Sequence, residues 1–206
     1  MLYTPPRFIE TDPDMIREVI AASPFAMLIS SVDGMPVVTH APVVPDEASG
    51  ENWLAAHVAC ANPHSAALGD GSEVLVVFNG PHTYVSPSWY EEASVPTWNY
   101  AVVHVCCRVH VQTGEAAQAL LDKLTATFDD ATQPGHKSRE ERAHLLKLIH
   151  CFTLEPLQID AKFKLSQNKT TAEQQQIVTK LSQLENENAQ GVANLMLRNL
   201  AAGFGR

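Results

Sequence analysis

The stretch from Tyr100 to Val111 alternates two kinds of residue, and it constrains the fold more than any other part of the chain. One alternate set is small or apolar: Ala101, Val103, Val105, Cys107, Val109 and Val111. The other set is more polar: Tyr100, Val102, His104, Cys106, Arg108 and His110. Successive side chains of a strand point to opposite faces, so the pattern predicts a strand with one face in a core. The opposite face meets solvent, a ligand or a second subunit.

The rest of the chain predicts further strands, most of them ahead of the helices. The Asp33-Gly34 pair predicts a tight hairpin between strands at 25–30 and 36–44, because its turn needs positive φ. Other strands are predicted at 53–58, 73–78 and 157–165, the last with Leu157, Ile159, Ala161, Phe163 and Leu165 inward. Strands grouped in this way favour an antiparallel sheet or barrel over repeated βαβ units. We expect one domain over residues 1–206, mainly β with helical decoration (α+β).

Helices are predicted from end signals and apolar spacing. Asp12 and Pro13 open the first, which carries Met15, Ile16, Val19 and Ile20. The others run at 115–128, from Ser138 (capped with Glu141) through Ile149, from Thr171 (capped with Gln174), and finally along Val192, Leu195, Met196 and Leu200. Residues from about 171 to 206 therefore form a helical C-terminal extension.

Net charge and cysteine usage limit the classes of protein to which this chain can belong. The chain has 23 acidic and 14 basic residues, a formal charge of −9, which disfavours a broad nucleic-acid surface. No apolar run is long enough to span a bilayer, and the N-terminus lacks the layout of a secretory signal. The four cysteines form no C-x-x-C pair, so free thiols in a cytoplasmic protein are expected.

Two segments carry candidate binding chemistry. Residues 79–90 and 95–100 are rich in aromatic, hydroxyl and turn-forming residues, typical either of a ligand-facing loop or of a loop rigidified by packing. Residues 164–169 read Lys-Leu-Ser-Gln-Asn-Lys, which is either a site for a phosphate monoester or a solvated strand end. His57 with Cys60, and His104 with Cys106, lack a second pair at ligand spacing, so we expect no metal site. Nucleophile-elbow and nucleotide-binding motifs are absent, so no catalytic residue is assigned.

Several motifs follow one another along the chain: Tyr3 to Glu10 with the helix that follows, His57-Val58-Ala59 with Ala61-Asn62-Pro63, Gly80-Pro81-His82, the stretch from Tyr84 to Tyr90, Val95 to Val102 with His104, and Lys164 to Asn168. Together they resemble the PaiB family of transcriptional regulators, within the FMN-binding split-barrel superfamily. The resemblance covers nearly the whole chain in the expected order.

The resemblance implies a six-stranded antiparallel split barrel that forms a homodimer and binds FMN near the subunit interface. A flavin needs apolar support, donors for its carbonyls and cations or donors for its phosphate. The candidate cofactor-binding residues are Thr39, His40, Asn62, Trp98, Asn99, Lys164, Ser166, Gln167 and Asn168.

Our leading hypothesis is a flavin-binding regulator without substrate turnover. A flavin-dependent oxidoreductase on the same barrel is the alternative, since one fold hosts many functions. A haem-binding protein is the second alternative, although no feature selects an axial histidine. DNA is a weakly supported partner because of the acidic charge.

Overall fold

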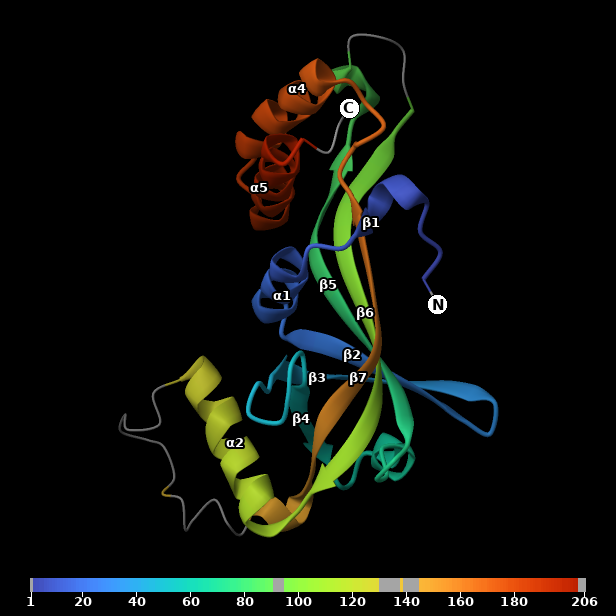
Figure 1. Cartoon of the computed structure of the whole chain (residues 1–206), viewed down its shortest axis with the longest axis vertical. Coiled ribbons are helices and arrows are strands. Elements are labelled where there is room, and N and C mark those ends of the chain that lie inside the picture. Colours follow the sequence, from blue (N-terminus) through green and yellow to red (C-terminus); the bar gives the residue numbers. More distant parts are fainter. Residues whose placement is uncertain (1, 91–94, 130–137, 139–144, 204–206) are drawn as a thin grey trace. The chain divides into compact units, whose positions relative to one another are not determined.

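A seven-stranded, mostly antiparallel sheet dominates the computed structural model, which describes residues 2–90, 95–129, 138 and 145–203 (Figure 1). Its strands are β1 Ile9–Glu10, β2 Phe25–Val32, β3 Met35–Pro45, β4 Leu54–Ala59, β5 Glu73–Val85, β6 Thr97–Gln112 and β7 Ile149–Lys164. Neighbours follow the order β1-β7-β4-β3-β2-β5-β6, and β6 also pairs with β7. The second pairing closes six strands into a ring, with β1 added on β7. The predicted six-stranded barrel is therefore confirmed.

The β2–β3 hairpin forms where the sequence predicts it. Asp33 and Gly34 have φ of 52° and 79°, the positive values that a tight primed turn requires. Antiparallel register runs without a break from Val32 opposite Met35 to Phe25 opposite Pro42.

Strand β6 also has the two faces that the alternation predicts. Val103, Cys107 and Val109 are fully buried, whereas His104 and Cys106 are half-buried and Arg108 is exposed. The one departure on the core face is Val111, which is half-buried near the strand's end.

Helices and short 3-10 helices connect the strands or lie before the first and after the last of them. They are α1 Pro13–Ala22, α2 Gly114–Phe128, α4 Thr171–Ser182 and α5 Glu187–Ala201, with 3-10 helices η1 Pro6–Phe8, η2 Pro63–Ala67, η3 Pro87–Trp89 and η4 Leu145–Leu148. The Asp12 cap on α1 is confirmed, because the Asp14 amide donates to Asp12 Oδ1 at 2.9 Å. The cap of α4 is Thr170 with Glu173, one residue before the predicted pair, and both halves of the capping box form. Within the described ranges, no helix is both long and apolar enough to cross a membrane.

Strands β5 and β7 are longer than predicted. Strand β5 continues to Val85, so residues 79–85 are strand and not loop. Strand β7 begins at Ile149, and Leu145 to Leu148 form a 3-10 helix, so the predicted helix does not reach Ile149. Residues 139–144 of that helix lie outside the described part. Leu157 is 41% exposed because it falls between the stretches of β7 that pair with β4 and with β1.

The chain divides into two compact units, which we describe separately. Unit 1 comprises residues 1–19, 79–103 and 160–206, and unit 2 comprises residues 20–78 and 104–159. The boundary falls within β5, β6 and β7. Fully buried side chains in unit 2 include Leu28, Phe78, Phe152 and Leu154, and those in unit 1 include Phe163, Leu165, Ile177, Leu181 and Met196. In unit 1, α4 and α5 pack side by side (Figure 1).

Candidate functional site

In unit 1, four of the predicted site residues meet where β6 begins and β7 ends. The Lys164 ammonium donates to the Trp98 carbonyl oxygen at 2.6 Å and also to Thr97 Oγ1. Asn99 Nδ2 donates to Ser166 Oγ at 2.9 Å, and the Ser166 hydroxyl is 3.1 Å from Asn99 Oδ1, to which it donates. The structure therefore joins two segments more than 60 residues apart in the sequence.

The Asn99–Ser166 pair lies inside the fold. Asn99 is 0% exposed and Ser166 is 3% exposed, and Asn99 also contacts the Met196 sulfur of α5 at 3.6 Å. Ser166 has a φ of 63°, a left-handed conformation that is costly for a residue with a side chain. Burial raises the pKa of Tyr90, which also shares a side-chain hydrogen bond with Ser166. These contacts pin the start of β6 to the segment after β7 and to α5.

The next two predicted residues have different surroundings. Gln167 accepts a hydrogen bond from the Leu165 amide at 2.7 Å and donates to the Phe163 carbonyl at 2.6 Å. Its side chain therefore closes the turn after β7. Asn168 is exposed.

Trp98 lines a cavity of about 310 Å³ in unit 1, which we call the ring pocket. Its lining consists of Asn79, Gly80, His82, Trp98, Tyr100, Ala101 and Val102. The Trp98 side chain is 52% exposed, and its ring centroid lies 5.6 Å from that of His82 at an interplanar angle of 41°. The pocket thus has aromatic walls and one amide.

Two lysines add positive charge beside these rings. The Lys162 ammonium is 5.5 Å from the centroid of the Tyr100 ring and donates to the Tyr3 carbonyl at 3.0 Å. Burial, and then the charge of Lys162, lower the pKa of Lys164. Aromatic surface, an amide and ammonium groups are the types that a phosphorylated flat ring needs. The residues of unit 1 therefore fit FMN.

In unit 2, Thr39 and Asn62 form a second group together with His64. Asn62 Nδ2 donates to Thr39 Oγ1 at 3.0 Å, and His64 Nδ1 lies 2.9 Å from the same oxygen. Asn62 also caps η2 by accepting from the His64 amide at 3.0 Å. Burial lowers the pKa of His64, which favours the neutral imidazole, and its Nε2 has no hydrogen-bond partner in the described part of the chain.

His40 does not join this group. It follows Thr39 on β3, so the two side chains point to opposite faces of the sheet. The His40 ring instead stacks on Phe25, with centroids 5.8 Å apart. One flat ligand on one face of β3 cannot contact both residues.

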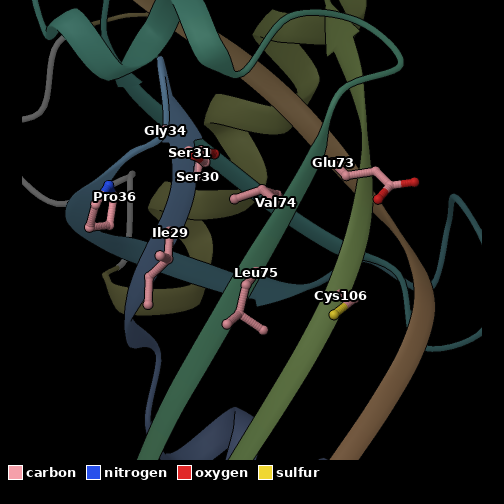
Figure 2. Close-up of a pocket in the computed structure, with 9 residues that line it drawn as sticks. All are labelled: Ile29, Ser30, Ser31, Gly34, Pro36, Glu73, Val74, Leu75 and Cys106. Atoms are coloured by element: carbon pink, nitrogen blue, oxygen red, sulfur yellow. The ribbon is translucent and has the colours of Figure 1, made fainter. Parts of the chain in front are cut away.

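Two further cavities contain none of the predicted residues. The larger, of about 440 Å³, opens in unit 2 where the pairing of β2 with β5 stops at Ile29 opposite Leu75. Figure 2 shows these two side chains with Cys106 of β6 around it. The other, of about 270 Å³, lies beside α2, where Lys123 Nζ is 2.6 Å from Asp46 Oδ1.

The list of candidate cofactor-binding residues left out His64, His82, Tyr100 and Lys162. The sequence held a signal for each of these residues. His64 and His82 follow prolines in the motifs that carry the family resemblance. Tyr100 lies on the polar face of its strand, and Lys162 alternates with Lys164. Among the described residues, no three His, Cys, Asp or Glu side chains cluster as metal ligands would.

Comparisons with known proteins agree with this geometry. By structure, the chain is similar to the FAD and heme binding protein from Mycobacterium smegmatis, with a TM-score of 0.60, 19% identity, and 76% of this chain and 73% of that one covered. It is also similar to a protein from Bacteroides thetaiotaomicron described as a "putative 5-nitroimidazole antibiotic resistance protein", with a TM-score of 0.58, 13% identity, and 75% of this chain and 85% of that one covered. The fold is that of the flavin-binding split barrels.

The sequence narrows this class to a family. Residues 2–158 match the family described as "Putative FMN-binding domain". Over 199 residues the chain is 30% identical to the "Protease synthase and sporulation protein PAI 2" of Bacillus subtilis, covering 95% of this chain and 96% of that protein. Over 226 residues it is 25% identical to the uncharacterized protein AN0679 of Emericella nidulans, covering 92% and 90%. The chain belongs to the PaiB-like family of FMN-binding domains, and FMN is its candidate cofactor.

Proposed function

We propose that this protein is an FMN-binding homodimer that regulates transcription and does not itself turn over a substrate. The observation that carries the proposal is the family match over residues 2–158, which includes the strands β2 to β6 of the ring. The residues that sequence reasoning selected support it, because Thr39 contacts Asn62 and Trp98 contacts Lys164.

FMN binding is tested on the purified protein. We expect added FMN to remain with the protein on gel filtration and to shift its visible absorption bands on titration at micromolar concentration. A colourless protein whose titration shows no change would contradict the proposed cofactor.

The absence of turnover is tested on the same complex. Mixed anaerobically with NADH or NADPH, the bound flavin is expected to keep its oxidised spectrum. Rapid bleaching would favour the flavin-dependent oxidoreductase instead.

A homodimer is supported by an apolar face of the β2–β3 hairpin in unit 2. Phe25 is 67% exposed and Val38 is 48% exposed, and the register places Ile29 opposite Val38 on the same face. A contiguous exposed apolar face is typical of an interaction surface, and a second copy of the chain would cover it.

Sedimentation tests the dimer. Val38→Asp is expected to raise the dimer dissociation constant, because it would bury a carboxylate in the interface. Leu157→Asp is the matched control, since Leu157 is also an exposed apolar side chain of unit 2. A wild-type monomer at micromolar concentration would contradict the proposal.

We base the proposed regulatory role on the family resemblance, and the negative net charge limits direct contact with DNA. A dimer carries twice the formal charge of −9, so we expect an indirect role or a small local contact with DNA. Mobility-shift experiments at physiological salt, with several upstream regions, separate these cases. Broad sequence-independent binding at that salt concentration would contradict this expectation.

A further inference from the structure

Trp98 combines an exposed side chain with a tightly held backbone. The residue is 52% exposed, which is unusual for the largest apolar side chain. On one side of the backbone, Lys164 donates to the Trp98 carbonyl at 2.6 Å and to Thr97. On the other, the buried Asn99 side chain is paired with Ser166 at 2.9 Å.

These hydrogen bonds order the backbone around Trp98 before any ligand binds. A bond from an ammonium group to a carbonyl is stronger than one between neutral groups, especially where burial removes water. A side chain whose backbone is already ordered loses less conformational entropy when a ligand contacts it. Trp98 is therefore prearranged as a surface on which a ring can stack.

The floor of the ring pocket is also fixed. A Cβ atom at Gly80 would lie 2.9 Å from Val19 Cγ1 and 3.1 Å from the Ala101 carbonyl oxygen, so β5, β6 and α1 meet closely there. His82 and Tyr100 complete the aromatic walls, and Asn79 supplies an amide. A cavity of about 310 Å³ lies at the small end of ligand sites, so it suits one ring system and not a whole nucleotide.

The charges beside the pocket favour an anionic ligand. The Lys162 ammonium lies 5.5 Å from the centroid of the Tyr100 ring. Its positive charge also contributes to lowering the pKa of the neighbouring Lys164, after burial. Lys164 already donates to Thr97 and Trp98, whereas Lys162 donates to the Tyr3 carbonyl oxygen at 3.0 Å. An ammonium group carries three donors, so Lys162 retains donors for an anionic group of a ligand.

We propose that the ring pocket binds a planar heteroaromatic ring that carries an anionic group, with Lys164 and the Asn99–Ser166 pair as positioning residues for Trp98. The inference rests on the proposed function where it identifies that ring as the isoalloxazine of FMN. Lys164 then acts through Trp98, and Lys162 faces the anionic group.

Fluorescence of Trp98 tests the site. The Trp53→Phe/Trp89→Phe double variant leaves Trp98 as the sole tryptophan, and its emission is followed on titration with FMN and with riboflavin, which has the ring without the phosphate. We expect quenching by both, with FMN bound more tightly. Lys162→Met is expected to remove most of that preference. Trp98→Ala in the otherwise native chain is expected to weaken FMN binding roughly tenfold, measured from flavin fluorescence.

A second measurement tests the positioning role without any ligand. In the single-tryptophan protein, Lys164→Met is expected to lower the fluorescence anisotropy of Trp98 and to weaken FMN binding, and Lys164→Arg is expected to restore both in part. Lys180→Met, which removes an exposed lysine of α4 in the same unit, is the matched control. Circular dichroism verifies that each variant folds.

The outcomes separate the two proposals. If the wild type binds FMN and Trp98→Ala binds it equally well, the ring pocket is not the site and the proposed cofactor stands. If the wild type does not bind FMN but riboflavin quenches Trp98, the stacking role of Trp98 stands, whereas the proposed cofactor and the role of Lys162 toward an anionic group are both wrong. If neither flavin quenches Trp98, the inference is overturned. Unchanged anisotropy and affinity in Lys164→Met would overturn the positioning role.

Discussion

The two units of this chain differ in charge more than in size. The residue ranges of unit 2 hold 13 acidic and six basic side chains, a net charge of −7. Those of unit 1 hold ten acidic and eight basic side chains, a net charge of −2. The charge of −9 for the whole chain is therefore concentrated in unit 2. Unit 1 can present positive charge locally at Lys162 and Lys164.

Cysteine and histidine side chains are also concentrated in unit 2. All four cysteines and eight of the nine histidines fall in unit 2, and His82 is the histidine of unit 1. Thiol reagents therefore report on unit 2, whereas Trp98 reports on unit 1. Each unit therefore has its own reporter, and the following variants use the two reporters in order of decreasing expected effect.

The largest effect is expected from Phe152→Ala in unit 2. Phe152 is 0% exposed, and removing a fully buried aromatic ring costs about 3–5 kcal/mol of unfolding free energy. Denaturant unfolding followed by labelling of the buried Cys107 and Cys151 measures this loss. Leu157→Ala, at an exposed site on the same strand, is the control and is expected to change little. If Trp98 fluorescence and thiol labelling move by equal amounts, the units do not unfold separately.

A smaller loss is expected from Asn99→Ala in unit 1. The change leaves the buried Ser166 hydroxyl without its partner, which costs about 1–3 kcal/mol. Ser166→Ala and the double variant complete a double-mutant cycle, read from Trp98 fluorescence during unfolding. We expect the double variant to lose less than the sum of the single variants. Strict additivity would show that the pair contributes no coupling.

Local signals predicted most of the fold. The Asp33-Gly34 turn, the alternation along β6 and the Asp12 cap each depend on neighbouring residues, so the sequence contains the whole of their cause. The extent of β5 and β7 could not be predicted in this way, because pairing with other strands sets it. Strand β7 starts at Ile149 because that residue pairs with Ala59 of β4, about 90 residues earlier.

The candidate site was predicted in residue type more than in arrangement. Sequence reasoning selected Asn99, Ser166 and Lys164 as ligand donors, and the structure shows each bonded within unit 1. Donor type is readable in a sequence, but its partner is fixed by tertiary contacts such as the one between Asn99 and Met196 of α5. Thr39 and His40 are a different case, since the strand predicted at 36–44 already places adjacent residues on opposite faces, so their separation was readable in the sequence.

The buried thiols of unit 2 predict a loss of stability in alkali. Burial raises the pKa of Cys107 to about 12 and that of Cys151 to about 11, against 9 for an exposed thiol. Above pH 9 the unfolded chain releases these protons while the folded chain keeps them, so unfolding becomes more favourable as pH rises. The loss is under about 1 kcal/mol for each thiol at pH 9.5. Chemical denaturation between pH 8 and 10 measures it, and Cys107→Ala/Cys151→Ala is expected to flatten the dependence. An equally steep dependence in that variant would assign it to other groups.

The smallest effect is expected at an exposed ion pair of unit 1, between Arg198 of α5 and Glu18 of α1. Both side chains are about half exposed, so water and salt screen their attraction, and Glu18→Gln is expected to cost about 0–1 kcal/mol. The loss should shrink further in 0.5 M salt, whereas the effect of Asn99→Ala should not, since that pair is buried and uncharged. Both changes affect contacts of α5, because Asn99 reaches Met196 on the same helix. Trp98 fluorescence during denaturation compares them directly. If Glu18→Gln destabilises unit 1 as much as Asn99→Ala, the ion pair and not the buried amide holds α5 in place.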